Sequence, residues 1–195
     1  MQNSNLTIEP KYYTLYKFFN SMFLGLSMGS IFTIYAPLKP SIYSIGGIIL
    51  ALGMIAVAKY YEKILNINYF FKISLLVEFV ILFIVIFYLI KPYGYMTALL
   101  VYSGYQLTFM FGSYLVRAET LLLKEDKLLS RVDMAKQAGN LTGMLISFLF
   151  YKLLEYFGDI SNNSDKVYYM HYLLLVSELI IITLIFKSFV QKSLS

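Results

Sequence analysis

Apolar residues occur in long continuous blocks that short charged segments separate. Six of these blocks have about the length, 17 to 25 residues, that a helix needs to cross a bilayer core about 30 Å thick. The blocks cover residues 18–35, 42–58, 73–90, 96–116, 138–157 and 167–186. Because they are continuous rather than alternating, they predict helices and not the strands of a barrel. We expect an all-α, polytopic membrane protein with six transmembrane helices.

The fifth block is the least regular. Its strongly apolar part, residues 141–151, is too short to cross a bilayer, and Lys152 and Glu155 follow it. Extending the helix to residues 138–157 gives the required length. Lys152 then lies near one end of the helix and has Glu155 as an i,i+3 partner.

Composition excludes several classes of protein. Only 14% of the residues are charged and the mean hydropathy is +0.68, whereas a soluble domain has about 25% charged residues. The chain is too apolar for either a soluble globular or a disordered protein. It has no cysteine and one histidine, His171, which excludes thiolate and histidine-based metal sites. With no nucleotide-binding loop or nucleophile arrangement either, we expect no enzyme, no cofactor and no metal.

The basic residues set the predicted orientation. Most of them fall in the two tails and in the second and fourth loops: Lys11, Lys17, Lys59, Lys63, Lys72, Arg117, Lys124, Lys127, Arg131, Lys136, Lys187 and Lys192. The other three loops hold only Lys39, Lys91 and Lys166. Because cytoplasmic loops carry the excess of Lys and Arg, both termini are predicted to lie inside, in the cell inner membrane. The net charge of +5 is thus a topology signal, and we expect no binding of nucleic acid.

The predicted organisation has five parts: a cytoplasmic tail (1–17), four helices (18–116), a cytoplasmic loop (117–137), two helices (138–186) and a second tail (187–195). The loop mixes leucines with charged residues. That mixture predicts an amphipathic helix that lies on the membrane surface with its apolar side down.

Small residues repeat at steps of four in two of the blocks. Close approach through small residues holds membrane helices together. The two stripes are Ser21, Gly25, Gly29, Thr33 and Ala135, Gly139, Gly143, Ser147. The second block also has Gly46, Gly47, Ala51 and Gly53, whereas blocks three and six are bulky. We therefore expect tight contacts for helices one, two and five, and more peripheral positions for three and six.

Six helices with both ends inside, a basic second loop and a long charged fourth loop resemble one half of a transporter of the major facilitator superfamily. After the second block, the segment from Ala58 to Lys63 stands where the family carries Gly-x-x-x-Asp-Arg, so Glu62 and Lys63 take the acidic and basic places. The fifth block begins with Gly139-Asn140-Leu141-Thr142-Gly143, similar to the glycine-rich start of the family's fifth helix.

The resemblance implies that helices one and four line a central cavity and that helices two and five face a second half. A substrate site in this family lies between the two halves. The expected partners are therefore the lipid bilayer, a second copy or another six-helix subunit, and an unidentified small-molecule substrate.

Polar residues at membrane depth are candidates for function because they are costly there. At 1.5 Å per residue, Glu78 lies about 8 Å and Glu178 about 12 Å from the cytoplasmic end of its helix, and Gln106 lies near the centre of the fourth. One interpretation is that the two carboxyl groups couple proton movement to transport. The other is that each is neutral or hydrogen-bonded and only fixes packing.

Further candidates lie at the predicted interfaces. Glu62, Lys63, Arg117 and Glu119 are either a cytoplasmic gate or anchors at the membrane surface. His171, among Tyr168, Tyr169 and Tyr172, is typical of an aromatic belt.

Three functions fit these patterns. The first is a half-size transporter that resembles the major facilitator superfamily, with proton coupling as an option. The second is the substrate-binding membrane subunit of an energy-coupling-factor uptake system, which is also a six-helix protein. The third is an accessory or assembly protein of the membrane that transports nothing.

Overall fold

Prolines and asparagines mark where the long helices begin. The computed structural model describes residues 6–191. In it, α1 (Pro10–Tyr35) and α2 (Pro40–Lys59) start on prolines, which suit the first helical position because no hydrogen bond is needed there. Before α4 (Ile67–Ile90) and α8 (Asn163–Ser188), the side chains of Asn66 and Asn162 accept hydrogen bonds from backbone amides of the first turn.

The remaining elements are shorter or more polar. They are β1 (Leu6–Ile8), α3 (Tyr61–Ile64), α5 (Tyr95–Met110), α6 (Gly112–Leu123), α7 (Asp126–Phe157) and β2 (Phe189–Gln191). The fold is all-α apart from the two short strands, so the all-α part of the predicted class is confirmed. Residues 1–5 and 192–195, the outer parts of the predicted tails with Lys192, lie outside the described residues.

Four helices, α1, α2, α4 and α8, are long and apolar enough to cross a membrane. This agrees with a membrane protein. Each helix extends beyond its predicted block, and α1 begins eight residues before residue 18, so that Lys17 lies inside the helix and not at its end. The fourth block is divided between α5 and α6, and the fifth block is the second part of the longer helix α7.

The fourth block is not one unbroken helix, as predicted from residues 96–116. The chain breaks at Phe111, between α5 and α6. Two features explain the break: the Thr108 hydroxyl donates to the Tyr105 carbonyl 2.8 Å away, and Gly112 follows. Such a bond bends a helix, and glycine lowers the helix propensity.

The prediction of a separate surface helix at residues 117–137 is wrong. The chain turns at Lys124, which has a φ of 43°, and the residues from Asp126 onward are the first turns of α7. Leu123 and Val132 are buried in the protein core. These two side chains therefore pack on protein, whereas Leu121 and Met134 in the same segment are exposed.

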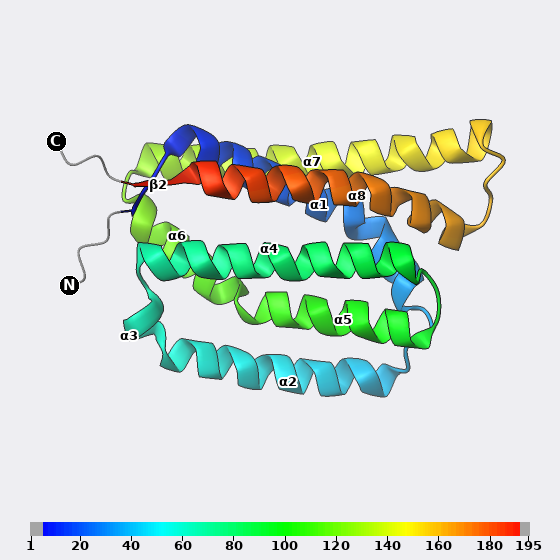
Figure 1. Cartoon of the computed structure of the whole chain (residues 1–195), viewed down its shortest axis with the longest axis horizontal. Helices are drawn as coiled ribbons and strands as arrows, with labels where there is room; N and C mark the ends of the chain where they lie inside the picture. Colours follow the sequence, from blue (N-terminus) through cyan, green and yellow to red (C-terminus); the bar gives the residue numbers. More distant parts are fainter. Residues whose placement is uncertain (1–5, 192–195) are drawn as a thin grey trace.

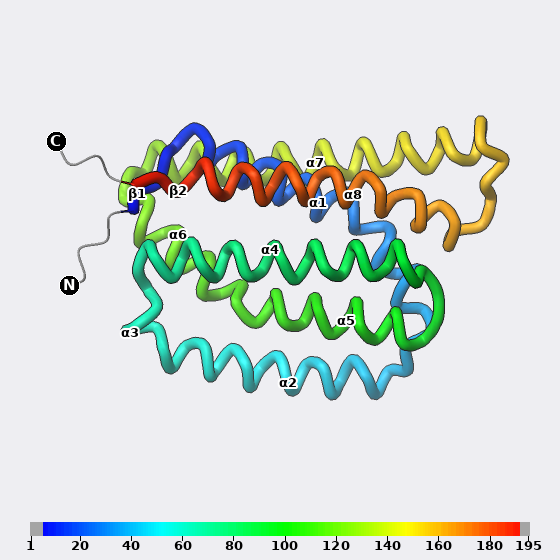
Figure 2. The backbone as a smooth tube through the Cα atoms, viewed as in Figure 1, coloured from blue at the N-terminus to red at the C-terminus, as the bar shows by residue number. Residues whose placement is uncertain are grey.

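All the long helices run along one axis of the molecule (Figure 1). The layer of α1, α7 and α8 packs on α4, which is followed by α5 and then by α2 at the far edge. The backbone trace in Figure 2 shows β1 and β2 at the same end of this bundle. There β1 and β2 pair antiparallel, with Thr7 opposite Val190. No pattern in the sequence predicted this ribbon.

The two small-residue stripes face each other where α1 crosses α7. A Cβ atom at Gly139 or Gly143 would collide with the backbone of α1, and one at Gly25 with the backbone of α7. Further along, Ser147 is buried, Gly29 lies against the Tyr151 ring, and Ser21 and Thr33 are half-buried. Glycine is required at these crossings because the two backbones touch.

The predicted packing of the other helices is wrong. In α2 only Gly46 is buried, whereas α4 and α8 are among the most buried helices and pack on each other. Their bulky side chains interdigitate and so create contact without small residues. The small residues of α2 serve only two local contacts, of Gly46 with Tyr102 and of Gly53 with Met110.

Candidate functional site

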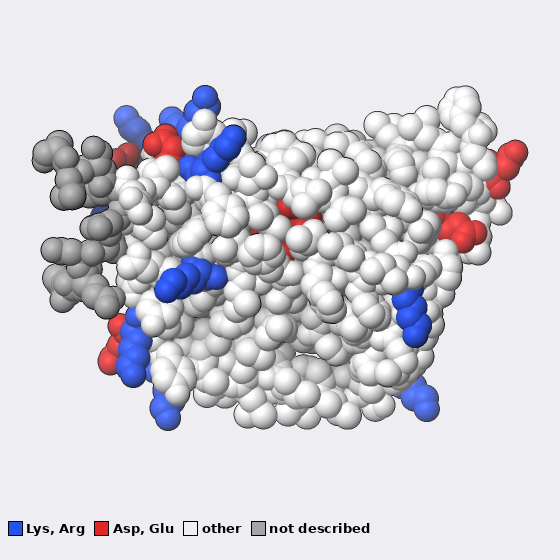
Figure 3. Space-filling model, viewed as in Figure 1, with Lys and Arg blue, Asp and Glu red and all other residues white. Residues whose placement is uncertain are grey.

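Charged side chains gather at the two ends of the molecule. Figure 3 shows Lys and Arg mainly at the end that holds the termini, and a nearly uncharged band between the ends. Acidic atoms are nevertheless visible, recessed in the middle of this band. A charge at this depth is costly unless it has a partner or faces water, so the middle of the bundle is where a functional group stands out.

An acidic pair lies in that band. Glu78 on α4 is 1% exposed and Glu178 on α8 is 0% exposed. The two carboxyl groups are close enough to interact with each other. Both were candidates from the sequence, which gave no indication that they meet. They meet because α4 and α8 pack side by side at the same depth.

Helix α1 supplies the hydrogen-bond donors to Glu78. The Tyr16 hydroxyl donates to Glu78 Oε1 at 3.0 Å, and the Asn20 side-chain amide donates to the same oxygen at 2.9 Å. Among residues 6–191, no side chain or backbone group donates a hydrogen bond to Glu78 Oε2 or to either oxygen of Glu178. The Ser74 hydroxyl, one turn before Glu78, is also buried without a partner and lies near the Tyr16 hydroxyl.

A second buried carboxylate lies nearer the end with the termini. Glu119 on α6 is 3% exposed. It accepts from the Tyr13 hydroxyl at 2.6 Å, pairs with Lys17 at 2.8 Å, and also pairs with Lys136. These side chains come from α1, α6 and α7, so the cluster joins three helices.

The two lysines decide the charge state of Glu119. Burial alone would raise the pKa of this carboxyl, but the attraction of Lys17 and the hydrogen bonds from Lys136, Lys17 and Tyr13 outweigh burial, so the pKa lies below its usual range. Glu119 is therefore ionised at neutral pH. Its charge is balanced inside the protein and not by solvent.

Lys17 connects the two clusters. Its ammonium group pairs with Glu119, lies 5.0 Å from the centre of the Tyr16 ring, and is close enough to attract the Glu78 carboxylate. From its place beside the first apolar block, Lys17 was expected only to bound a helix, and this role was not predicted. The signal was present as polar residues at steps of three and four on one face of α1, Tyr13, Tyr16, Lys17 and Asn20, followed two turns later by Ser27 and Ser30.

The remaining predicted residues do not join either cluster. Gln106 is half-buried on α5, and its carbonyl oxygen has no partner. Glu62, Lys63 and Arg117 are exposed, and Arg117 lies over the Tyr61 ring at 5.6 Å. Glu119, the fourth of these predicted interface residues, pairs instead with Lys17 of α1 and Lys136 of α7.

His171 is not a belt residue at the surface. It is 3% exposed, stacks on Tyr88 with 3.9 Å between ring centres, and its Nδ1 lies 2.8 Å from the Val167 carbonyl oxygen. Its burial follows from its position on the face of α8 that packs on α4. Outside this stack, Tyr168 and Tyr172 bond to each other, as expected near an interface.

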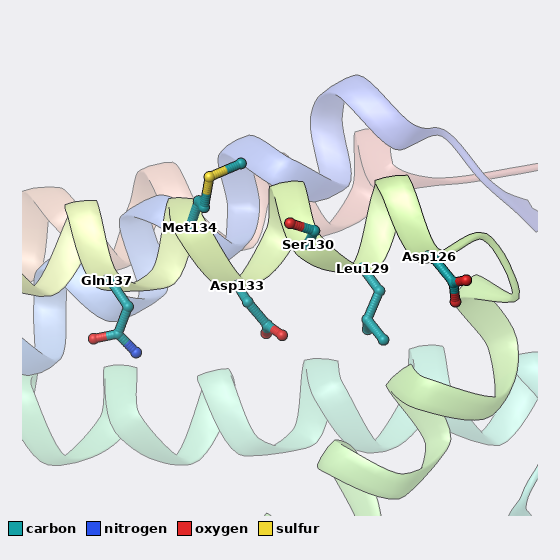
Figure 4. Close-up of a pocket in the computed structure, with 6 residues that line it drawn as sticks. All are labelled: Asp126, Leu129, Ser130, Asp133, Met134 and Gln137. Atoms are coloured by element: carbon teal, nitrogen blue, oxygen red, sulfur yellow. The ribbon is translucent and has the colours of Figure 1, made fainter.

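The larger cavities of the described residues are open to the surface: one of about 770 Å³ lies beside Tyr61 and α6, and one of about 420 Å³, lined almost entirely by apolar side chains, lies between α4 and α5. The groove in Figure 4 is lined by residues of α7 alone, among them Asp126, Asp133 and Gln137. Two cavities bounded by several helices, near Thr33 at the end opposite the termini, measure about 230 and 120 Å³. Both lie below the roughly 300 Å³ at which pockets for small molecules begin.

Comparison of the chain with models of protein families, with curated proteins and with solved structures gave no match. The functional assignment therefore rests on the helix arrangement and on the two buried clusters.

Proposed function

We propose that this chain is a six-span membrane transport protein, equivalent to one half of a transporter of the major facilitator type, and that it works together with a second six-helix unit. The acidic pair of Glu78 and Glu178 couples transport to the movement of a cation. Gln106 on α5 faces the substrate path.

The observation that carries this proposal is a symmetry in the helix contacts. Helix α1 packs on α7 and α8, while α5 packs on α2 and α4. Exchanging α1 with α5, α2 with α7, and α4 with α8 maps these four contacts onto one another, with the α4–α8 contact at the centre; the smaller α7–α8 contact has no such counterpart. A half of the major facilitator type is built from two triplets as inverted repeats, and this likeness supports the proposal.

The position of the acidic pair supports a coupling role. Glu78 and Glu178 occupy the contact between α4 and α8, where the two triplets meet. A change of charge there acts on both triplets at once. Tyr16 and Asn20 extend this influence to α1, which the proposal places at the substrate cavity.

The outer face of α2 supports pairing with a second unit. Gly47 has nothing within 4 Å of an added Cβ atom, and Ser44 and Ala51 are exposed on the same helix. Small residues that face away from their own bundle favour close packing with another helix in the membrane. An energy-coupling-factor subunit needs a pocket of its own instead, and the small cavities near Thr33 do not favour that alternative.

Uptake by the purified chain in liposomes tests the proposal. A screen of labelled amino acids, sugars and organic ions across an imposed cation gradient should find at least one substrate that accumulates. Glu78→Gln and Glu178→Gln should abolish accumulation, whereas Glu155→Gln, which alters an exposed ion pair, should preserve it. Normal accumulation by both buried-site variants would refute the coupling role. Failure of every substrate, with self-crosslinking absent in native membranes, would refute the transporter.

A further inference from the structure

The acidic pair in the middle of the bundle has too few hydrogen-bond donors for two ionised groups. Tyr16 and Asn20 both donate to Glu78 Oε1. Within residues 6–191, nothing donates to Glu78 Oε2 or to either oxygen of Glu178. An ionised carboxyl group only accepts hydrogen bonds, and two buried carboxylates at close range repel each other strongly. A proton held between them removes this repulsion and supplies the missing donor.

The donors from α1 indicate which of the two carboxyl groups holds the proton. Glu78 already accepts two hydrogen bonds and is attracted by Lys17, so it is the better stabilised of the two as a carboxylate. Glu178 is 0% exposed and has no donor, which favours its neutral form. The two groups lie within hydrogen-bonding reach of each other. A hydroxyl on Glu178 therefore donates to Glu78, which then has three donors.

Lys17 is placed to replace the charge of that proton. Its side chain is buried and pairs with Glu119 at 2.8 Å. It also lies 5.0 Å from the centre of the Tyr16 ring, and the hydroxyl of this ring bonds Glu78. Glu119 has a second partner in Lys136. Lys17 can therefore turn from Glu119 toward the pair without leaving Glu119 with no counter-charge.

The other titratable groups that face the pair, among the described residues, are two phenols. Tyr16 belongs to α1 and Tyr105 to α5, where it lies near the pair, and a phenol is neutral at neutral pH. Glu119 of α6 and Lys136 of α7 lie behind Lys17. The charge beside the pair therefore depends on the proton and on Lys17.

We propose that Glu178 binds one exchangeable proton and shares it with Glu78. When the proton leaves, Lys17 moves from Glu119 to the pair and replaces its charge. The O–H bond of Glu178 breaks, its electron pair stays on the carboxylate, and the proton passes to water as the transport cycle opens the pair. The inference rests on the proposed function for this opening, and it deepens that function by naming the proton as the coupling cation and Lys17 as the group that responds to it.

Infrared spectroscopy of the purified chain in detergent tests the site without requiring transport, because a protonated carboxyl group has a C=O stretching band of its own that shifts in heavy water. Wild-type protein should show the band in neutral buffer, where exposed carboxyl groups are ionised, and should lose it in alkaline buffer while still folded by circular dichroism. Glu178→Gln should lack the band. Glu78→Gln should keep it at a shifted frequency, because an amide accepts a weaker hydrogen bond than a carboxylate. Glu155→Gln, which alters an exposed ion pair, is the matched control and should match wild type.

Two variants that break the same ion pair separate the movement of Lys17 from a general loss of stability. Lys17→Met removes the replacement charge, so the band should persist to a pH about one unit higher than in wild type. Glu119→Gln frees Lys17 for the pair, so the band should disappear about one unit lower. Lys17→Arg keeps the charge and should titrate as wild type does. Shifts of the first two variants in the same direction, or no shift in either, would overturn the role of Lys17.

The proton site itself fails if wild-type protein lacks the band in neutral buffer, if the band survives wherever the chain is folded, or if Glu178→Gln retains it. Transport distinguishes this failure from that of the proposed function. If a substrate accumulates in liposomes under a Na⁺ gradient and not under a pH gradient, the proton is wrong as the coupling ion and the transporter stands. If the band titrates as expected and no substrate accumulates, the proton site stands and the transporter fails.

Discussion

At the scale of single residues, the buried charges are balanced by partners from other helices. Sequence analysis found Glu78, Glu178 and Glu119 because charges among apolar residues stand out. It did not find Lys17 and Lys136 as their partners. Those pairings depend on how α1, α6 and α7 turn relative to one another, and no spacing along the chain encodes that rotation.

Replacing Glu119 by Gln leaves two lysines without their shared counter-charge. Removing one partner of a buried ion pair costs about 3 kcal/mol. The Glu119→Gln variant should therefore have a clearly lower melting temperature in detergent, measured by circular dichroism. Asp133→Asn removes the exposed partner of Lys136, which is paired at 3.0 Å, and should melt within a degree or two of wild type.

The same substitution predicts a pH effect. The folded-state pKa of Glu119 lies below its unfolded value. Its contribution to stability is thus complete above the unfolded pKa of about 4.3 and is lost as pH falls through the lower folded value. The Glu119→Gln variant should lose less stability than wild type over that acidic window. An equally steep loss in both proteins would contradict the assigned charge state.

At the scale of elements, hydrophobic blocks predicted the long helices well and the interruptions poorly. The blocks that became α1, α2, α4 and α8 are bounded by proline, lysine or asparagine, which have local effects. The break at Phe111 and the turn at Lys124 lie inside segments whose composition does not change sharply. The apolar stripe of residues 117–137 was visible, but a stripe alone does not distinguish lipid from a neighbouring helix.

The crossing of α1 and α7 should tolerate no side chain at its glycines. Gly143→Ala places a methyl group against the backbone at Met22 and Leu26. Overpacking of this kind costs about 2 kcal/mol, so the melting temperature should fall. Gly112→Ala, where an added Cβ atom meets nothing within 4 Å, is the control. Equal stability of the two variants would mean that α1 and α7 do not approach so closely.

At the scale of the whole molecule, the pairing of β1 with β2 places both termini at one end of the bundle. Charge asymmetry predicted termini on the same side, and the helix contacts fit an even number of crossings. The symmetry between the two helix triplets was not visible in the sequence. It became apparent only from which helices touch, since the residues that make equivalent contacts differ.

The central claim is that the chain crosses the membrane six times, with residues 96–116 of α5 and α6 forming the fourth crossing and residues 138–157 of α7 the fifth. Single cysteines introduced into this cysteine-free chain and labelled in sealed cells with a membrane-impermeant maleimide test it directly. Positions 41, 93 and 161 should label from outside, and positions 66 and 124 only after permeabilisation. Labelling of positions 93 and 124 from the same side would contradict the six-span account.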